Sequence, residues 1–243
     1  MEIGLISDVH ANVVALRTVL EDAPSVEEWL HAGDVVSYGP WPRETIALFQ
    51  ERDIVSIQGN HDTAVIAIFN DAGVSQEKFV GLPRLLAEWT ADHIGEEEIA
   101  YLDALPIELD RYDGRVHVAH GAPGAPTKRT YADDVDASLL GEEDVLMVGH
   151  THEQFLREFD EGTVVNPGGT GQPRGGDPRA CYAVLDLDTG AVDLRRVAYP
   201  VEEIQEAARE YDFPEPLVPA RPIVAPAGTS RLTSSRMMSS PSS

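Results

Sequence analysis

The chain has 243 residues, 42% of them hydrophobic, which is enough for one large α/β domain or two small ones. Its 18 basic and 42 acidic residues give a formal net charge of −24, and a surface this acidic would repel nucleic acid and anionic lipid. No apolar run approaches the ~20 residues that a membrane-spanning helix needs.

The first third of the chain alternates between strand and helix patterns. The expected elements are strands at 2–7, 26–31 and 54–57 and helices at 12–20, 44–52 and 64–69. Asn12 stands where the first helix would take its N-cap. This alternation predicts βαβ units and a mainly parallel sheet. Residues 76–105 interrupt the rhythm with apolar residues at helical spacing, so we expect a helical cap there.

The second half consists of short apolar segments joined by Gly and Asp turns. The expected strands are 107–109, 116–119, 145–148, 155–159, 163–165, 181–185 and 192–197. They predict a second sheet packed on the first. Residues 201–210 have the spacing of a last helix. We therefore predict one domain over residues 1–212, followed by a Pro- and Ser-rich tail at 213–243 that is largely disordered.

Side chains of metal-binding type follow these segments on short loops. They form five blocks, which read Asp8-Val9-His10, Gly33-Asp34, Gly59-Asn60-His61-Asp62, His120-Gly121 and Gly149-His150-Thr151-His152. Four of the blocks directly follow an apolar run, and open α/β folds keep their sites at the carboxyl ends of strands. Leaving His61 and Asp62 aside, the blocks offer two Asp, one Asn and four His. This mixed ligand set suits Mn, Fe, Zn or Ni better than Ca or Mg and exceeds what one ion needs, so we predict a two-metal site.

The first two blocks indicate how the ligands would act. Asp8 and His10 leave the first strand two residues apart, so both side chains can face one ion. Gly33 lets the backbone approach closely before Asp34, to which we assign the bridge because a carboxylate has two oxygens. A single His at a strand end is commonly structural, but a buried cluster of acids and imidazoles is costly without a metal.

The ordered blocks resemble the signature of calcineurin-like metallophosphoesterases, which runs DxH, GD, GNH[DE], a lone His and GHxH. Val165-Asn166-Pro167-Gly168 is similar to the NPG turn of their small prokaryotic phosphodiesterase branch. The resemblance implies a two-sheet αββα sandwich, which the helical cap would accompany. It also implies two metal shells: Asp8, His10, Asp34 and His152 for one ion, and Asp34, Asn60, His120 and His150 for the other.

The reaction that the resemblance implies is hydrolysis of a phosphoester by a hydroxide that bridges two divalent ions, with Mn expected first and Fe, Zn or Ni as alternatives. His61 would stabilise charge and protonate the leaving oxygen, the alternative being a structural histidine. Asp62 is expected to cap the following helix. Asn12 and Tyr38 are candidate substrate contacts. The alternative role of Asn12 is a helix cap, and that of Tyr38 is a packing residue.

The second block departs from the Ser/Thr phosphatases of this family, which carry GDxVDRG. Ser37 stands where they have the acid that supports the catalytic His, and Tyr38 where they have a phosphate-binding Arg. No obvious Arg is left to grip a phosphomonoester dianion, which favours a phosphodiester or pyrophosphate-type bond. A dinucleoside polyphosphate hydrolase, a phosphomonoesterase and a non-catalytic scaffold, like the retromer subunit with this fold, remain alternatives. The glycine-rich stretch at 168–171 lacks the context of a phosphate-binding loop and is interpreted as a turn near the metals.

The expected partner is a small-molecule phosphoester, and a homodimer is left open. The N-terminus begins with a strand-like run and has no signal region, so we expect a cytoplasmic location. The excess of acidic residues leads to the hypothesis of a halophilic origin, in which high salt screens the repulsion between them.

Overall fold

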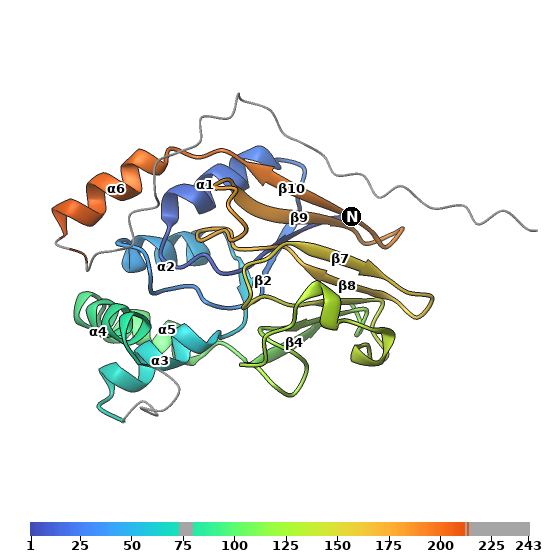
Figure 1. The fold of residues 1–243 in the computed structure, drawn as a ribbon, viewed down its shortest axis with the longest axis horizontal. Coiled ribbons are helices and arrows are strands. Elements are labelled where there is room, and N and C mark those ends of the chain that lie inside the picture. Colours follow the sequence, from blue (N-terminus) through green and yellow to red (C-terminus); the bar gives the residue numbers. More distant parts are fainter. Residues whose placement is uncertain (73–79, 212, 214–243) are drawn as a thin grey trace, which may run out of the picture.

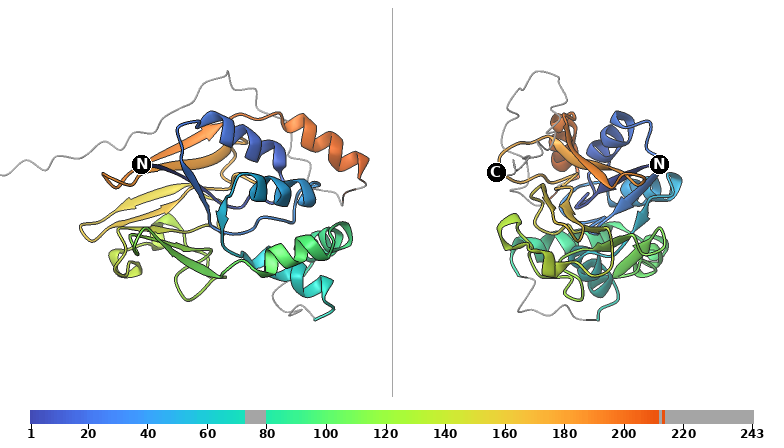
Figure 2. Two further views of the ribbon diagram at one scale, coloured as in Figure 1. Left: turned by 180° about the vertical axis from the view of Figure 1, so that it is seen from behind. Right: turned by 90° about the vertical axis from the view of Figure 1, so that its right-hand side faces the viewer.

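The computed structural model describes residues 1–72, 80–211 and 213 (Figure 1). Two five-stranded sheets lie face to face, and helices cover the outer face of the first one (Figures 1 and 2). The outer face of the second sheet is covered by two short 3₁₀ turns, η1 (Ala132–Asp134) and η2 (Ala137–Leu139), and the loops around them. This is the predicted two-sheet α/β sandwich, with a thinner outer layer on one side.

The first sheet joins strands from both ends of the chain. Its parallel part consists of β1 (Glu2–Ile6), β2 (Glu28–His31) and β3 (Val55–Ser56), which confirms the predicted βαβ units. The antiparallel strands β9 (Ala180–Asp186) and β10 (Ala191–Val197) complete the order β10-β9-β1-β2-β3. The prediction that these two strands belong to the second sheet is therefore wrong. Almost all of β9 is buried, and an apolar run of that kind identifies a strand without identifying its neighbours.

The second sheet has the order β4-β5-β6-β8-β7. Its strands are β4 (Glu108–Arg111), β5 (Val116–Ala119), β6 (Val145–Met147), β7 (Phe155–Glu158) and β8 (Thr163–Asn166). The three central strands are parallel, and β4 and β7 are antiparallel edges. The predicted segments match these strands to within a few residues.

The core is divided by the first sheet, as the alternation of side chains along β1 illustrates. Ile3 and Leu5 face the second sheet, whereas Ile6 faces the helices α1 (Val13–Asp22) and α2 (Pro42–Glu51). Gly4 leaves room for a neighbouring ring, because a Cβ there would lie 2.2 Å from an atom of Trp29. Both faces of β1 are therefore buried, which is why its sequence is apolar throughout.

Three further helices pack together at one end of the sandwich (Figure 1). They are α3 (Asn60–Phe69), α4 (Leu82–His93) and α5 (Glu96–Asp103). The predicted helical insert at 76–105 corresponds to α4 and α5, its first residues lying outside the described ranges. The last helix, α6 (Val201–Glu210), has the predicted limits. The predicted tail from 213 onward lies outside the described residues except for Phe213. None of the described helices is long and apolar enough to cross a membrane.

Candidate metal centre

Two groups of three side chains meet where strands of both sheets end. One group is Asp8, His10 and His152, and the other is Asp34, His120 and His150. Within each group the potential ligand atoms lie within 4.8 Å of one another, and all but His150 are buried. The loops that carry them follow β1, β2, β5 and β6. The structure thus brings together six of the seven predicted metal ligands, and the seventh, Asn60, has its Oδ1 3.1 Å from Nε2 of His120.

Asp34 connects the two groups through one oxygen. Its Oδ2 lies 3.6 Å from Nε2 of His10 and 3.3 Å from Nε2 of His120. This oxygen is buried and has no hydrogen-bond partner among the described residues, whereas Oδ1 accepts the backbone N–H of His61 at 2.8 Å. Asp8 shows the same pattern. Its Oδ1 has no hydrogen-bond partner among the described residues, and its Oδ2 accepts a hydrogen bond from the hydroxyl of Ser7. A buried carboxylate oxygen without a donor needs a cation nearby, so both residues fit a metal.

The histidine rings are oriented by backbone carbonyls on their far side. Nδ1 of His10, His120 and His152 donates to the carbonyl oxygens of Val36, Ala32 and Gln172, at 3.2, 2.6 and 2.7 Å. A carbonyl only accepts, so Nδ1 carries a proton and Nε2 is the ring nitrogen that faces the site. Nε2 of His10 and Nε2 of His152 lie 3.3 Å apart. Two lone pairs facing each other at this distance repel unless a cation lies between them.

The electrostatics of the second group agree with a missing positive charge at its centre. Burial opposes ionisation of both Asp34 and His120, but the attraction between them dominates. It lowers the pKa of Asp34 well below its usual value and raises the pKa of His120 to about 10. The attraction to Asp34 therefore favours a positive charge at His120, and a metal ion bound there would compete with protons.

The ligand loops hold side chains in a backbone conformation that L-residues rarely adopt. The φ angles of the residues concerned are 52° for Asp8, 50° for His10, 64° for Asp34, 65° for His150 and 60° for His152. Such angles are costly and gather at functional sites. Glycine would relieve the strain but would remove the ligand. The sharp turns allow two ligands that are two residues apart after a strand to point toward the same site.

Asp62 fixes the position of the loop that carries Asp34. Its carboxylate accepts the N–H groups of Asp34, Val35 and Val36 at 2.9 to 3.2 Å, and that of Gly59 at 2.9 Å. It caps α3, as predicted, from the third position of the helix rather than from its start. A Cβ on Gly59 would lie 2.1 Å from Oδ1 of Asp34, so only glycine allows this close approach.

His61 lies on the first turn of α3 and belongs to neither group of three. Its side chain is buried, and its Nδ1 lies 3.2 Å from the hydroxyl of Ser37. Burial, helped by the neighbouring His152 and His120, lowers the pKa of His61 to about 4 against the attraction of Asp34. Ser37 is thus a neutral partner at the position where the Ser/Thr phosphatases have an acid.

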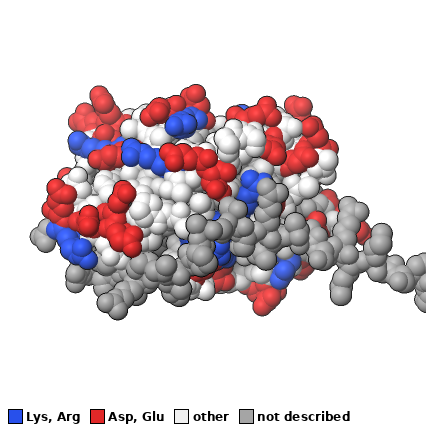
Figure 3. Space-filling model, turned by 90° about the horizontal axis from the view of Figure 1, so that it is seen from above, with Lys and Arg blue, Asp and Glu red and all other residues white. Residues whose placement is uncertain are grey.

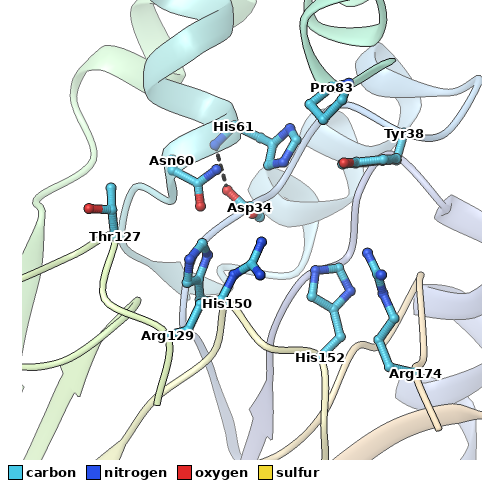
Figure 4. Close-up of a pocket in the computed structure, with 10 residues that line it drawn as sticks. All are labelled: Asp34, Tyr38, Asn60, His61, Pro83, Thr127, Arg129, His150, His152 and Arg174. Atoms are coloured by element: carbon cyan, nitrogen blue, oxygen red, sulfur yellow. Dashed lines mark hydrogen bonds between the residues drawn. The ribbon is translucent and has the colours of Figure 1, made fainter. Parts of the chain in front are cut away.

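The metal-ligand groups open into a pocket of about 460 Å³ (Figure 4). Its lining residues are Asp34, Tyr38, Asn60, His61, Pro83, Thr127, Arg129, His150, His152 and Arg174. The expectation that no arginine remains near the site is wrong, because Arg129 and Arg174 both line it. The sequence contains a signal for Arg174 only, because this residue closely follows the glycine-rich turn at 168–171 that was predicted to lie near the metals. The turn does contact the metal loop, since the N–H of Gly171 donates to the carbonyl of Asp8 at 3.1 Å.

Of the two predicted substrate contacts, only Tyr38 lines the pocket. Asn12 is fully buried, and its Oδ1 accepts the N–H of Ala15 as the N-cap of α1. Its amide nitrogen donates to the carbonyl of Gly171 at 2.9 Å and the hydroxyl of Tyr199 at 3.3 Å. These contacts use the side chain completely, so the structure gives Asn12 a structural role instead of the predicted contact with substrate.

We expect Asn12→Ala to lower the free energy of unfolding by about 2 kcal/mol, since it removes a helix cap and two buried hydrogen bonds. Urea denaturation of metal-saturated protein measures this change. The matched control is Asn70→Ala at the exposed end of α3, for which we expect less than about 0.5 kcal/mol. Equal stabilities of the two variants would contradict the structural role of Asn12.

Comparison with known proteins agrees with this geometry. The family model described as the calcineurin-like phosphoesterase superfamily domain matches residues 1–190. The crystal structure of a metallophosphoesterase from Sphaerobacter thermophilus is similar, with a TM-score of 0.75 and 33% identity, covering 90% of this chain and 98% of that one. The uncharacterized protein MJ0912 of Methanocaldococcus jannaschii is 29% identical over 234 residues (88% of this chain, 94% of the relative). Phosphodiesterase MJ0936 of the same organism is 29% identical over 170 residues (69% and 83%).

Proposed function

The chain belongs to the calcineurin-like phosphoesterase superfamily, and from that membership we propose that it hydrolyses phosphodiester bonds with two divalent transition metal ions. The proposed ligands are Asp8, His10, Asp34 and His152 for one ion and Asp34, Asn60, His120 and His150 for the other. The observation that carries the proposal is the buried Oδ2 of Asp34, which lies between the two groups without a hydrogen-bond donor. Nitrogen and oxygen ligands together favour Mn, with Fe, Zn or Ni as alternatives.

When bound, such ions would activate a water molecule as the nucleophile and neutralise charge on the phosphoryl oxygens. The protein supplies the positioning. Asp62 holds the loop of Asp34, and backbone carbonyls orient the histidine ligands. Ser37 lies beside Nδ1 of His61, and the ring stands at the pocket, where the negative charge of a bound phosphate would favour its protonated form and the ring would protonate the leaving oxygen.

Two observations favour a diester as the substrate. The similar protein MJ0936 is named a phosphodiesterase. In addition, Tyr38 stands beside the rings of His10 and His61, with centroids 4.8 and 4.6 Å away, and burial raises the pKa of its phenol. At the position where the Ser/Thr phosphatases have a phosphate-binding arginine, this wall of the pocket therefore offers a neutral hydroxyl.

We expect a bis-aryl phosphate to be cleaved with a higher kcat/KM than the aryl monoester with the same leaving group. The measurement compares the two substrates on protein loaded with Mn, and on protein stripped of metal as the control. A tenfold preference for the monoester, about 1.4 kcal/mol in transition-state stabilisation, would support a phosphomonoesterase instead.

We also propose that the protein works in the cytoplasm of a halophile. Acidic side chains are more widespread than basic ones on the face of the molecule in Figure 3, in keeping with the net charge of −24. The Debye length falls from about 10 Å at 0.1 M salt to about 3 Å at 1 M, so repulsion between surface carboxylates is largely screened at high salt. We expect the thermal unfolding midpoint to rise between low and multimolar KCl. An unchanged midpoint would contradict the halophilic origin.

A further inference from the structure

Two arginines stand across the pocket from the residues proposed for proton transfer. Figure 4 shows both arginine side chains on the side of the pocket where His150 and His152 lie, across from Asn60, His61 and Tyr38. Arg129 belongs to the loop after β5, and Arg174 to the loop after β8. They therefore bring two positive charges to the side of the pocket opposite His61 and Tyr38.

The charge environment of these arginines differs from that of most others in this acidic chain. Within the described ranges, the arginines that form ion pairs with carboxylates are Arg43, Arg52, Arg84, Arg111, Arg115, Arg157, Arg179, Arg195 and Arg196. Arg129 and Arg174 are in none of the ion pairs found in that part of the chain. Arg174 donates to the neutral side chain of Gln172 at 3.0 Å. No carboxylate in the described part of the chain neutralises either guanidinium group, so both are available to bind an anion that enters the pocket.

The loops under both arginines are fixed by the contacts that hold the metal ligands. The carbonyl of Gln172, two residues before Arg174, accepts Nδ1 of His152 at 2.7 Å. The loop from His120 to Arg129 closes on itself, because the hydroxyl of Thr130 donates to the carbonyl of Gly121 at 3.3 Å. The loop of Arg174 is thus tied to a metal ligand, and the loop of Arg129 is held by a hydrogen bond of its own.

The pocket is larger than a single phosphate requires. A volume of about 460 Å³ lies within the ~300–1,000 Å³ of ordinary small-molecule sites. Burial raises the pKa of Tyr38, while Arg174 and Arg129 both act to lower it, so the fields of the two guanidinium groups reach the same part of the pocket. The proposed metals would neutralise the reacting phosphoryl group, which leaves the arginines for a second anion.

We propose that Arg129 and Arg174 form a subsite for a second phosphate group, so that the preferred substrates are organic diphosphates. Each guanidinium presents a planar fork of donors, and a phosphate has enough oxygens to satisfy two forks, whereas a carboxylate has only two oxygens in total. This inference rests on the proposed function, because it takes the reacting phosphate to be held at the metal centre.

The test measures binding, so that it does not depend on turnover. Isothermal titration calorimetry follows methylenediphosphonate, a diphosphate analogue with a stable bridge, and inorganic phosphate binding to Mn-loaded protein. The variants are Arg129→Gln, Arg174→Gln and the double variant, with metal content measured for each. Arg52→Gln, an exposed arginine at the end of α2, is the matched control.

In the double variant we expect at least a tenfold loss of affinity for the diphosphonate and a loss of less than threefold for phosphate. Each single variant should lose less, and Arg52→Gln should bind both probes like the wild type. Equal losses for the two probes would mean that the arginines grip the reacting phosphate, and unchanged binding would mean that they grip neither. Either result would overturn the subsite.

The same proteins separate this inference from the function on which it rests. Arginine-dependent diphosphonate binding by a protein that cleaves no bis-aryl phosphate would leave the subsite standing and remove the phosphodiesterase. If the wild type cleaves bis-aryl phosphate but the double variant binds both probes normally, the phosphodiesterase would stand and the arginine subsite would be removed. A loss of metal from the double variant would be detected by metal analysis, and Arg129→Lys and Arg174→Lys then repeat the test with the charge retained.

Discussion

Asp34→Asn should leave the protein unable to hold two metal ions and should lower kcat/KM by at least about 100-fold. Residues that only orient metal ligands commonly contribute 10- to 100-fold, and a shared ligand should contribute no less. The substitution replaces a charged oxygen between His10 and His120 with part of a neutral amide, which is a poor bridge. Metal content per chain and kcat/KM on a bis-aryl phosphate measure the two effects.

Two controls define this experiment. His10→Ala removes a ligand from one group only, so it should weaken mainly one ion. Asp92→Asn makes the same chemical change on the exposed side of α4 and should change neither metal content nor rate. Two tightly held ions in Asp34→Asn would show that this carboxylate is not the bridge.

His61→Ala should lower kcat by about 10²- to 10⁴-fold, the usual contribution of general acid–base assistance, while both ions stay bound. The reason is its location: the ring lines the pocket and contacts Ser37, and it belongs to neither group of metal ligands. The measurement is kcat at matched metal occupancy. His93→Ala, an exposed histidine on α4, is the matched control and should retain the wild-type rate.

The leaving group reveals what His61 contributes. A nitrophenolate needs little protonation, so its loss should be smaller, whereas an alkoxide or nucleoside leaving group should show the larger loss. Equal losses for the two would indicate that His61 stabilises charge on the phosphoryl group instead of donating a proton. An unchanged rate would remove it from the mechanism and favour a non-catalytic scaffold.

The sequence predicted the metal centre better than the walls around it. Asp8 and Asp34 follow the neighbouring parallel strands β1 and β2, whose carboxyl ends lie at one edge of the first sheet, so the pattern of elements indicated that these two would meet. His120 follows β5 of the second sheet, and its place beside them was implied by the family resemblance. Arg129 and Arg174 are carried by loops without regular spacing. Where such a loop returns to the site depends on tertiary contacts, among them the hydrogen bond from Gly171 to Asp8, which no local pattern encodes.

The remaining differences have the same origin. The hydrophobic period identified β9 and β10 as strands but did not specify that β9 would pair with β1. Helix α3 begins four residues earlier than its apolar pattern, because Gly59 and Asp62 cap it from outside that pattern. Asn12 serves as a cap, as its position before a helix indicated, and its burial under Gly171 excludes it from the pocket.

The position of β1 between β2 and β9 governs the order of events on the ribosome. The first strand to be made cannot complete its pairing until β9 has been translated. At about 5 to 20 residues per second, roughly 10 to 35 s separate the two strands. During that time the antiparallel edge of β1 lacks its partner, and Asp8 and His10 have neither His152 nor the turn at 168–171 beside them. The first sheet and the surroundings of Asp8 and His10 are therefore completed only late in synthesis.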